Sequence, residues 1–349
     1  MTENYKDLIH KIQNILNKTV DNKKVYGTTV CITSHSFSWC GASRNFHTDD
    51  QYFIASTTKL FITAILLKLR EENKIQLDDQ ISKYLSEEIL NGLHILNGTE
   101  YSYDLTIKNL MAHTSGLPDY FQQKRENGKS LHDELTSGKD QSWSFEKVVE
   151  ESKKTKPAFK PNQKGKALYS DTNYQLLGKI IENITNKDIE SVLNAMVIEP
   201  LGLKKTYLYQ DINDKRPKTM YFKSNELHIP LAMTSSGPDG GIVSTAQEMM
   251  IFIEAFFKGK LFPKNYIEEL KEWNRIFFPI LSGIGIHRFK LPWIFSPFKS
   301  IPEIIGHSGL SGAFAYYCPL KELYLTGTVN QINSPETSYR LMIKLINLL

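Results

Sequence analysis

A serine and a lysine that could act together occur near the start of the chain, in "FIASTTKLF" (residues 53–61). Ser56 and Lys59 are three residues apart, and residues at this spacing are neighbours on a helix, with Cβ atoms about 5–6 Å apart. From Leu60 to Leu69 the sequence is apolar on nearly all sides, which predicts a helix buried in a core. A buried lysine favours its neutral form, and a neutral amine can accept a proton from a serine hydroxyl. The pattern therefore indicates an activated serine nucleophile. The alternative is that Ser56 caps the helix and Lys59 reaches solvent.

The Ser-x-x-Lys spacing alone is weak evidence, because about two such pairs arise by chance in a chain of this size. The sequence contains two further pairs, Ser144/Lys147 and Ser296/Lys299. The first is explained as a helix cap, with its lysine on a solvated face. The second is followed by a proline in "WIFSPFKS", which is typical of a loop. Only Ser56 opens a buried helix.

Two other short segments carry side chains that could take part in chemistry. Tyr169 and Asp171, in "LYSDTNY", precede a clear amphipathic helix. His307, Ser308 and Gly309 follow an apolar run and lead into a predicted strand, where glycine lets another backbone approach closely. The alternatives are a tyrosine placed by packing and a glycine-containing turn with an incidental histidine.

Taken in order, these three segments resemble the motifs of the penicillin-recognising serine hydrolases. This family includes class C β-lactamases, D-Ala-D-Ala carboxypeptidases, D-aminopeptidases and related esterases, and its motifs are Ser-x-x-Lys, Tyr-x-Asn and Lys/His-Thr/Ser-Gly. Four more stretches resemble family segments, and the resemblance runs from about residue 25 to the C-terminus. They are "KIQLDDQISKYL" (74–85), "LTIKNLMAHTSGLPDY" (105–120), "IEPLGLKKTYL" (198–208) and "GGIVSTAQEM" (240–249).

The resemblance implies a role for each matching residue. Ser56 would be the acylated nucleophile, and Lys59 the partner that helps to deprotonate it. Tyr169 would carry the proton to the leaving group and later activate water, with Lys59 helping it to ionise. The backbone N–H groups of Ser56 and Leu310 would form the oxyanion hole. The strand from about Leu310 to Tyr317 would pair with the acyl part of the substrate as an extra strand.

Two positions depart from the family pattern. Asp171 stands where the family has asparagine; it can pair with Lys59 but cannot donate an amide N–H to a substrate carbonyl. His307 takes the place of the family's lysine, with Ser308 and Gly309 beside it, and would face the substrate carboxylate or the tyrosine. At neutral pH a histidine is a weaker anchor for an anion than a lysine. Both departures argue against a specialised, efficient β-lactamase.

Other kinds of chemistry find no support in the sequence. It has no GxxxxGK[ST] phosphate loop, no HExxH and no paired His/Cys metal spacing, so we expect no metal and no organic cofactor. His113, in "AHTSG", is interpreted as a structural loop histidine, and "GPDGG" (237–241) as a tight turn. Cys31, Cys40 and Cys318 are odd in number and lack CxxC spacing, so we expect buried or idle thiols.

The predicted elements indicate how these residues are positioned. Strand-like runs lie near both ends of the chain, and helical patterns lie between them. Two of these runs, "KVYGTTVCIT" and "FSWCGASR", are separated by a short polar link, which predicts a hairpin. We therefore predict an α+β fold: a central antiparallel sheet built from both termini and flanked by helices, with an inserted helical subdomain. Residues 1–349 would form one composite domain, with an α/β part at about 1–56 and 226–349 and a helical part at about 57–225.

Composition limits the partners of this 349-residue chain. With 41% hydrophobic and 23% charged residues and a net charge of +4, it lacks the basic footprint of a nucleic-acid-binding protein. No run approaches the roughly 20 apolar residues of a membrane span. Residues 287–299 are basic and aromatic, so they could rest on a membrane surface or form a strand and loop near the cleft. The first 20 residues lack a signal-peptide core, which predicts a cytoplasmic protein, or a periplasmic or extracellular one if a leader was removed. Oligomeric state is left open.

The functional hypothesis is a serine hydrolase that works through an acyl-enzyme on Ser56, with a small molecule or peptide as its partner. Its substrates would be D-amino-acid peptides, in a carboxypeptidase- or aminopeptidase-like reaction, or β-lactam amides. One alternative is a carboxylesterase acting on small acyl esters. A second is a catalytically retired binding protein, against which the complete set of Ser56, Lys59 and Tyr169 argues.

Overall fold

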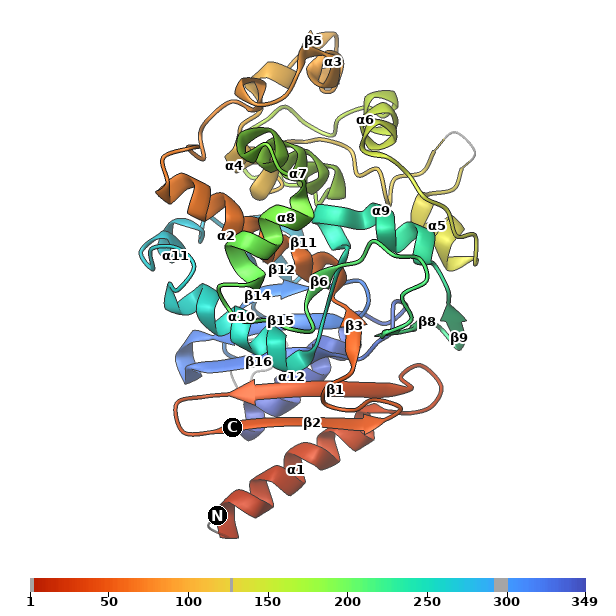
Figure 1. Cartoon of the computed structure of the whole chain (residues 1–349), viewed down its shortest axis with the longest axis vertical. Helices are drawn as coiled ribbons and strands as arrows, with labels where there is room; N and C mark the ends of the chain where they lie inside the picture. Colours follow the sequence, from red (N-terminus) through yellow and green to blue (C-terminus); the bar gives the residue numbers. More distant parts are fainter. Residues whose placement is uncertain (1–2, 126–127, 292–300) are drawn as a thin grey trace.

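A large antiparallel sheet forms the centre of the molecule in the computed structural model, which describes residues 3–125, 128–291 and 301–349. The sheet has eight strands, and Figure 1 shows that its colours come from both ends of the chain. In spatial order the strands are β11 (Asn274–Phe277), β12 (Ile280–Ser282), β13 (His287–Phe289), β14 (Ile304–Ser308), β15 (Ala313–Cys318), β16 (Leu323–Thr328), β1 (Gly27–Thr33) and β2 (Ser38–Arg44). The predicted α+β fold, with a sheet built from both termini, is confirmed.

The two faces of this sheet bury different sets of helices, because side chains alternate along a strand. On β1, Val30 and Ile32 join the core under α1 (Glu3–Thr19) and α12 (Glu336–Leu348). Cys31, between them, joins the larger core on the opposite face, which contains α10 (Ala246–Lys258). The candidate nucleophile segment lies on that second face.

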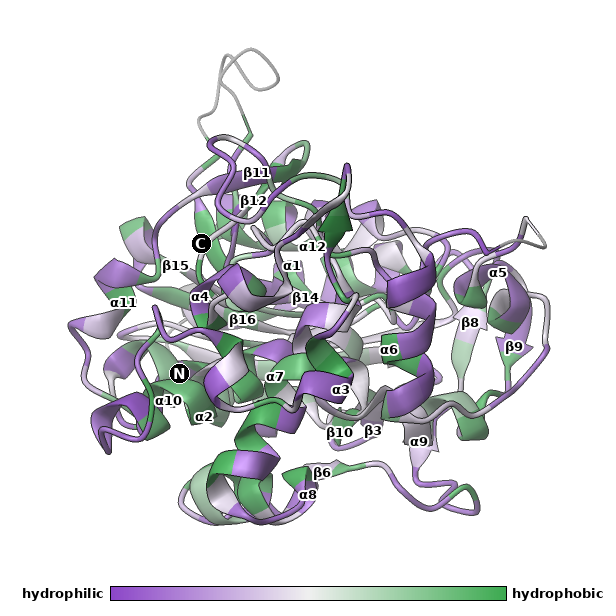
Figure 2. Ribbon diagram, turned by 90° about the horizontal axis from the view of Figure 1, so that it is seen from above, coloured by the Kyte–Doolittle hydropathy of each residue, from purple (hydrophilic) through white to green (hydrophobic). Residues whose placement is uncertain are grey.

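Most of the helices lie between the two halves of the sheet in the sequence and stack above it in Figure 1. The long buried helix α2 (Thr58–Glu71) is predominantly apolar, whereas α6 (Phe145–Lys154) is largely hydrophilic in the ribbon of Figure 2. The other helices are α3 (Glu87–Leu90), α4 (Ile107–Met111), α5 (Leu131–Thr136), α7 (Asp171–Thr185), α8 (Ile189–Leu193), α9 (Pro230–Gly240) and α11 (Tyr266–Glu269). None of the helices in the described part of the chain combines the length and apolar character needed to cross a bilayer.

Small sheets complete the fold. A four-stranded sheet has the order β6 (Tyr207–Leu208), β10 (Ile242–Ser244), β3 (Gln51–Phe53) and β7 (Pro217–Lys218). Two hairpins are β4 (Ile95–Leu96) with β5 (Thr99–Glu100), and β8 (Met220–Phe222) with β9 (Asn225–Leu227). Strand β3 leads directly into the turn that carries Ser56, so this sheet fixes where the nucleophile segment begins.

The predicted hairpin near the N-terminus is confirmed, but the expectation for its cysteines was wrong. The antiparallel register of β1 and β2 sets Cys31 directly opposite Cys40. The two sulfur atoms form a disulfide bond, because facing residues of an antiparallel pair bring their Cβ atoms close together. Cys318 is a buried free thiol, as expected.

The expectation that residues 310–317 pair with substrate as an added strand is also wrong. Strand β15 pairs with β14 on one side and with β16 on the other, so its backbone hydrogen-bonding groups are already used. Only the turn before it, which contains Leu310 and Ser311, faces the cavity described below.

Candidate active site

Ser56 lies on a short 3-10 turn, Ala55–Thr57, between β3 and α2. The backbone of Ala55 has a φ of 46°, a left-handed conformation that costs a residue with a Cβ about 1–2 kcal/mol. Strain of this kind is often found at functional sites. The turn gives Ser56 no capping role, because neither it nor α2 has a side-chain cap, and Ser56 is half-buried at the wall of a cavity.

The His-Ser-Gly segment approaches the same turn from β14. A Cβ on Gly309 would lie 2.2 Å from the carbonyl oxygen of Ile54, so only glycine allows the two backbones to come this close. The Ser311 hydroxyl donates a hydrogen bond to the carbonyl of Phe53 at 2.7 Å, which ties the following turn to β3. This contact brings together segments about 250 residues apart in the sequence, as the family resemblance implied.

Lys59 is fully buried, with no exposed surface, so the alternative in which it reaches solvent is excluded. Its Nζ lies 2.6 Å from Oδ1 of Asp171 and donates a 2.6 Å hydrogen bond to the carbonyl of Asp239. It also lies over the rings of Tyr169 and Tyr174, 5.3 Å and 5.2 Å from their centroids. The pairing between Lys59 and Asp171 that the sequence suggested is therefore present.

Tyr169 lies beside Ser56 and forms a side-chain hydrogen bond with it. Burial, followed by the charge of Asp171, raises the pKa of Tyr169 well above its ordinary value, and the hydrogen bond with Ser56 offsets only part of this. The expectation that a nearby lysine would help this tyrosine to ionise is wrong, because Asp171 balances the charge of Lys59. Tyr169 is therefore a neutral phenol in the resting site.

A loop holds the start of α7, and with it Asp171, in place. The Ser170 and Thr172 hydroxyls both donate to the carbonyl of Pro118, at 2.9 Å and 2.7 Å. The Ser170 N–H donates to Nδ1 of His113 at 3.1 Å. Since that nitrogen accepts, His113 serves as a structural loop histidine, as predicted.

Three buried histidine rings surround Tyr169. His113 stacks on the Tyr169 ring with centroids 4.5 Å apart, and His287 and His307 lie 5.9 Å and 6.4 Å away. The rings of His287 and His307 stack on each other at 3.8 Å. Burial lowers the pKa of His113 and His307 well below the ordinary value and that of His287 to about 3, so all three rings are neutral.

His307 therefore takes one of the two positions expected for it. It is 1% exposed, its Nδ1 lies 2.8 Å from the carbonyl of Ser308, and it neighbours Tyr169. Neither His307 nor Tyr169 is among the residues that line the cavity, and the contact that the structure gives His307 at the site is with the ring of Tyr169. The hydroxyl of Ser308 pairs with that of Tyr339 at 2.7 Å, away from the nucleophile.

Sequence reasoning missed His287 and two buried aspartates, Asp119 and Asp239. Asp119 accepts hydrogen bonds from the N–H groups of Phe121, at 3.0 Å, and Asp171, at 3.4 Å. Asp239 lies in the segment that was interpreted as a tight turn, but this segment ends helix α9 after a kink at Gly237. None of the three occurs in the motifs used above, although "GLPD" and "GPDGG" both carry an aspartate in a predicted loop, which is a weak signal.

A cavity of about 80 Å³ opens onto Ser56. Leu310 lines it together with Ser56, so the two proposed oxyanion-hole residues border the same cavity. Helix α5 forms part of another wall, through His132, Leu135 and Thr136. A larger hollow of about 520 Å³ lies elsewhere, near Lys258 and Lys264, and Ser56 is not part of its lining.

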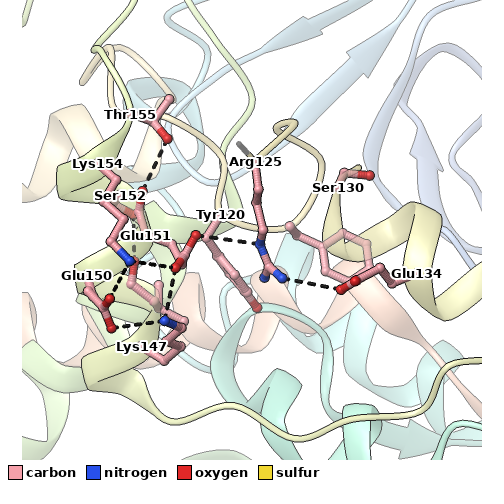
Figure 3. A network of polar contacts seen from close by, with 12 residues as sticks. Tyr120, Arg125, Ser130, Glu134, Lys147, Glu150, Glu151, Ser152, Lys154 and Thr155 are labelled. Atoms are coloured by element: carbon pink, nitrogen blue, oxygen red, sulfur yellow. Dashed lines mark hydrogen bonds and ion pairs between the residues drawn. The ribbon is translucent and has the colours of Figure 1, made fainter. Parts of the chain in front are cut away.

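An ion-pair network supports the α5 wall (Figure 3). Arg125 contacts Glu134 of α5 at 3.3 Å and Glu151 of α6 at 3.6 Å, which links the two helices. Lys147 belongs to this network through Glu151, at 3.0 Å. Ser144 caps α6 by accepting a hydrogen bond from the N–H of Lys147, as predicted, so this Ser-x-x-Lys pair is structural.

The remaining Ser-x-x-Lys pair, Ser296/Lys299, lies outside the described residues, as does most of the aromatic segment 287–299. Within the described residues, no group of three or more His, Cys, Asp or Glu side chains is arranged to hold a metal ion.

Comparison with known proteins agrees with this fold. A family model described as Beta-lactamase matches residues 12–345. The D-alanyl-D-alanine-carboxypeptidase/endopeptidase AmpH of Escherichia coli (strain K12) is 24% identical over 307 residues, which are 84% of this chain and 74% of that protein. The D-amino acid amidase of Ochrobactrum anthropi SV3 shares 22% sequence identity at a TM-score of 0.78, over 97% of this chain and 100% of that one. EstCE1, described as a hydrolase with promiscuous acyltransferase activity, shares 18% identity at a TM-score of 0.77, over 98% of both chains.

Proposed function

Because this chain belongs to the β-lactamase family and is a serine hydrolase, we propose that Ser56 forms an acyl-enzyme with amino-acid amides or peptides of the D series, or with β-lactams. The observation that carries this proposal is the buried Lys59, which lies within 2.6 Å of Asp171 and over the ring of Tyr169 at the end of a cavity lined by Ser56. Burying an ammonium group this fully is costly unless partners offset the cost, so the arrangement supports a functional role.

In the proposed reaction, Oγ of Ser56 attacks the acyl carbonyl and the C–N bond to the leaving amine breaks. The Tyr169 hydroxyl accepts the proton of Ser56 as it delivers its own proton to the leaving nitrogen, and the Lys59 ammonium group stabilises the negative charge that develops during this relay. Water then attacks the acyl-enzyme, returns the proton to Ser56 and releases the acid. The N–H groups of Ser56 and Leu310 would stabilise the oxyanion in both steps.

A carboxylesterase reaction is the second candidate, and Asp171 is the observation that favours it. An ionised carboxylate accepts hydrogen bonds but donates none, so it cannot hold an amide carbonyl as asparagine could. Esters also need less help from a general acid, because an alkoxide leaves more readily than an amide anion. The esterase reading and the amidase reading share the same acyl-enzyme on Ser56.

The test is intact-mass spectrometry after incubation with a fluorophosphonate, benzylpenicillin and D-alanine p-nitroanilide. We expect the fluorophosphonate to add one adduct to the wild-type protein and none to Ser56→Ala. Ser144→Ala is the matched control, because it removes the serine of a structural Ser-x-x-Lys pair and should leave labelling intact. Labelling of Ser56 without any turnover of the anilide would favour the esterase. Absence of all labelling would overturn the proposal and leave the binding-protein alternative.

The disulfide bond is informative about the cellular compartment of the protein. Disulfide bonds persist in oxidising compartments and are rare in the cytosol, so the Cys31–Cys40 bond supports the periplasmic or extracellular alternative. Thiol titration of the denatured protein, purified without reductant, is expected to find the single thiol of Cys318. Three reactive thiols would contradict this location.

A further inference from the structure

Asp239 is a buried carboxylate that none of the steps above uses. It is 5% exposed, and its Oδ2 accepts hydrogen bonds from the Tyr120 hydroxyl at 2.7 Å and from the Gln175 side-chain amide at 2.9 Å. Figure 3 shows Tyr120 pointing away from the ion-pair network, in keeping with its bond to Asp239. Two fixed donors hold the carboxylate in one orientation.

Both of these hydrogen bonds go to Oδ2, and the other oxygen, Oδ1, receives no side-chain or backbone hydrogen bond from the residues that the structure describes. Asp239 lines the same cavity as Ser56. The next residue, Gly240, lies against the backbone of Ala55, because a Cβ there would be 3.7 Å from the Ala55 carbonyl carbon. Asp239 is therefore at the same cavity as the nucleophile turn, and Oδ1 is available to accept a hydrogen bond from a ligand.

The charges around this oxygen do not balance. Lys59 binds the backbone carbonyl of Asp239, not its carboxylate, and Lys59 already pairs with Asp171 at 2.6 Å. In the described part of the chain, the cavity lining contains Asp171 and Asp239 but no lysine or arginine. His132 also lines the cavity, but burial lowers its pKa, so it supplies little positive charge at neutral pH.

Most of the larger side chains in the rest of the cavity wall are apolar, beside the polar Gln122, His132, Thr136, Ser236 and Ser311. The larger apolar residues are Phe121, Leu135, Met220, Leu227, Ile229, Met233, Leu310 and Ile332. A ligand that fits this space would place an apolar group against these side chains and a cationic hydrogen-bond donor at Asp239.

We propose that Asp239 binds the free α-ammonium group of the acyl residue, so that the enzyme selects amino-acid amides and peptides with an unblocked amino terminus over N-acylated ones. This inference rests on the proposed function, since it assigns the acyl side of the same cavity. The ammonium group donates a hydrogen bond to Oδ1 of Asp239. Its positive charge balances the negative charge of this carboxylate. Apolar side chains of the acyl residue then pack on the remaining wall.

The selectivity should depend on pH in a defined direction. Burial, followed by the charge of Asp171, raises the pKa of Asp239 to about 7, while Lys59, Gln175 and Tyr120 act to lower it. The polar and charged groups around the Asp239 carboxylate are Lys59 on α2, Asp171 and Gln175 on α7, and Tyr120 in the loop after Pro118. His132 of α5 lines the same cavity. Since only the ionised carboxylate attracts an ammonium group, KM for the free amine should fall as pH rises from about 6 to about 7.5. It should rise again above about 8, where α-amino groups lose their proton.

The kinetic test compares D-alanine p-nitroanilide with N-acetyl-D-alanine p-nitroanilide, using wild type and Asp239→Asn. Asparagine keeps an oxygen for Tyr120 and Gln175, so it removes the charge and little else. Removal of a hydrogen bond to a charged group is expected to lower kcat/KM for the free amine by about tenfold to a hundredfold. We expect the preference for the free amine, as the ratio of kcat/KM values, to fall by at least tenfold in the variant. An unchanged ratio, or a wild type that prefers the acetylated substrate, overturns the inference.

A binding test separates this inference from the proposed function. Calorimetry measures the affinity of D-alanine amide and N-acetyl-D-alanine amide for Ser56→Ala and for Ser56→Ala/Asp239→Asn, in which no acyl-enzyme forms. We expect Ser56→Ala to bind D-alanine amide more tightly than N-acetyl-D-alanine amide. We expect this difference to disappear in Ser56→Ala/Asp239→Asn. If Ser56 of the wild type is labelled but amine binding is the same in both variants, the inference fails and the proposed function stands. If amine binding follows Asp239 but Ser56 is never labelled, the proposed function fails and the ammonium site stands.

Discussion

At the scale of single residues, the site is organised by one buried ammonium group. Lys59 has no exposed surface and is held by Asp171 and by the carbonyl of Asp239. Truncating one partner of such a buried pair leaves an uncompensated charge, whereas a neutral isostere changes the electrostatics with little change of shape. The two aspartates are therefore the positions where single substitutions are most informative.

Asp171→Asn should change both the pH profile and the substrate preference. The charge of Asp171 raises the pKa of Tyr169, so asparagine should lower that pKa. If neutral Tyr169 is the proton donor, activity is lost as pH rises through its pKa, and the alkaline limb should move to lower pH. The new amide N–H could also bind a substrate carbonyl, so the ratio of anilide to ester turnover should rise. Profiles of kcat against pH with p-nitroanilide and p-nitrophenyl ester substrates check both points. An alkaline limb that does not move would show that Asp171 does not act on Tyr169.

Asp239→Asn should stabilise the protein at alkaline pH. The pKa of Asp239 is raised from 3.8 to about 7, so the fold disfavours its ionised form and stability falls as pH rises from about 4 to 7. The asparagine variant avoids this loss, which is on the order of 2–4 kcal/mol at pH 8. Urea unfolding at pH 5 and pH 8 measures the free energy of unfolding of both proteins. The difference in favour of the variant should be larger at pH 8. A variant that loses stability at both pH values would contradict the assigned pKa direction.

At the scale of elements, the nucleophile depends on two backbone segments that meet. Strand β3 delivers Ser56 through the strained Ala55, and the end of β14 lies against it at Gly309. Helix α9 reaches the same point because Gly178 of α7 leaves room for Pro238, where a Cβ would be only 2.5 Å away. Glycine is needed at position 309 because the backbone of Ile54 takes the space that a side chain would fill, and at position 178 because the ring of Pro238 takes it.

Gly309→Ala should reduce activity more than it reduces stability. A Cβ would lie 2.2 Å from the carbonyl oxygen of Ile54 and would push the turn containing Leu310 away from Ser56. A displacement of about 1 Å at a reacting centre can cost about 100-fold in rate, so we expect a 10- to 100-fold slower fluorophosphonate labelling. Gly306→Ala is the control, because its Cβ would meet Ala315 within the sheet at 2.0 Å. Equal labelling losses in the two variants, at equal losses of stability, would mean that Gly309 serves the sheet alone.

At the scale of the whole molecule, the two ends of the chain close the sheet on which the site rests. Strand β1 pairs with β16, and α1 packs with α12 over the face opposite to α10. The N-terminal helix thus contributes to stability without contacting the cavity, whose lining begins at Ala55.

Leu16→Ala should therefore separate stability from chemistry. Leu16 belongs to α1, and its side chain is fully buried in the core between this helix and the sheet. Truncation of such a leucine to alanine lowers the free energy of unfolding by about 2–5 kcal/mol. We expect a lower denaturation midpoint and an unchanged rate of Ser56 labelling well below that midpoint. Lys11→Ala, at an exposed position of the same helix, should stay within about 0.5 kcal/mol of wild type. A slower labelling rate in folded Leu16→Ala would show coupling between α1 and the site.

The sequence by itself determined the fold class, the family and the segments of the site. Strand-like runs at both ends and a buried apolar helix after Ser56 were enough for the α+β architecture, because these patterns are local. The order of the three motifs then implied Ser56, Lys59 and Tyr169, which the tertiary structure brings together at one cavity wall or directly behind it.

Only the tertiary structure decided the electrostatics. Asp239, His287 and Asp119 lie outside the three catalytic motifs, and they become part of the site because packing of α9, β13 and the loop around Pro118 buries them there. Their charges, and the neutral state of Tyr169, depend on burial and on distances of a few ångströms between segments. The disulfide likewise required the register of β1 and β2, since spacing alone does not state which residues of a hairpin face each other. Local patterns specify elements, whereas pKa values and pairings arise from contacts that no local pattern contains.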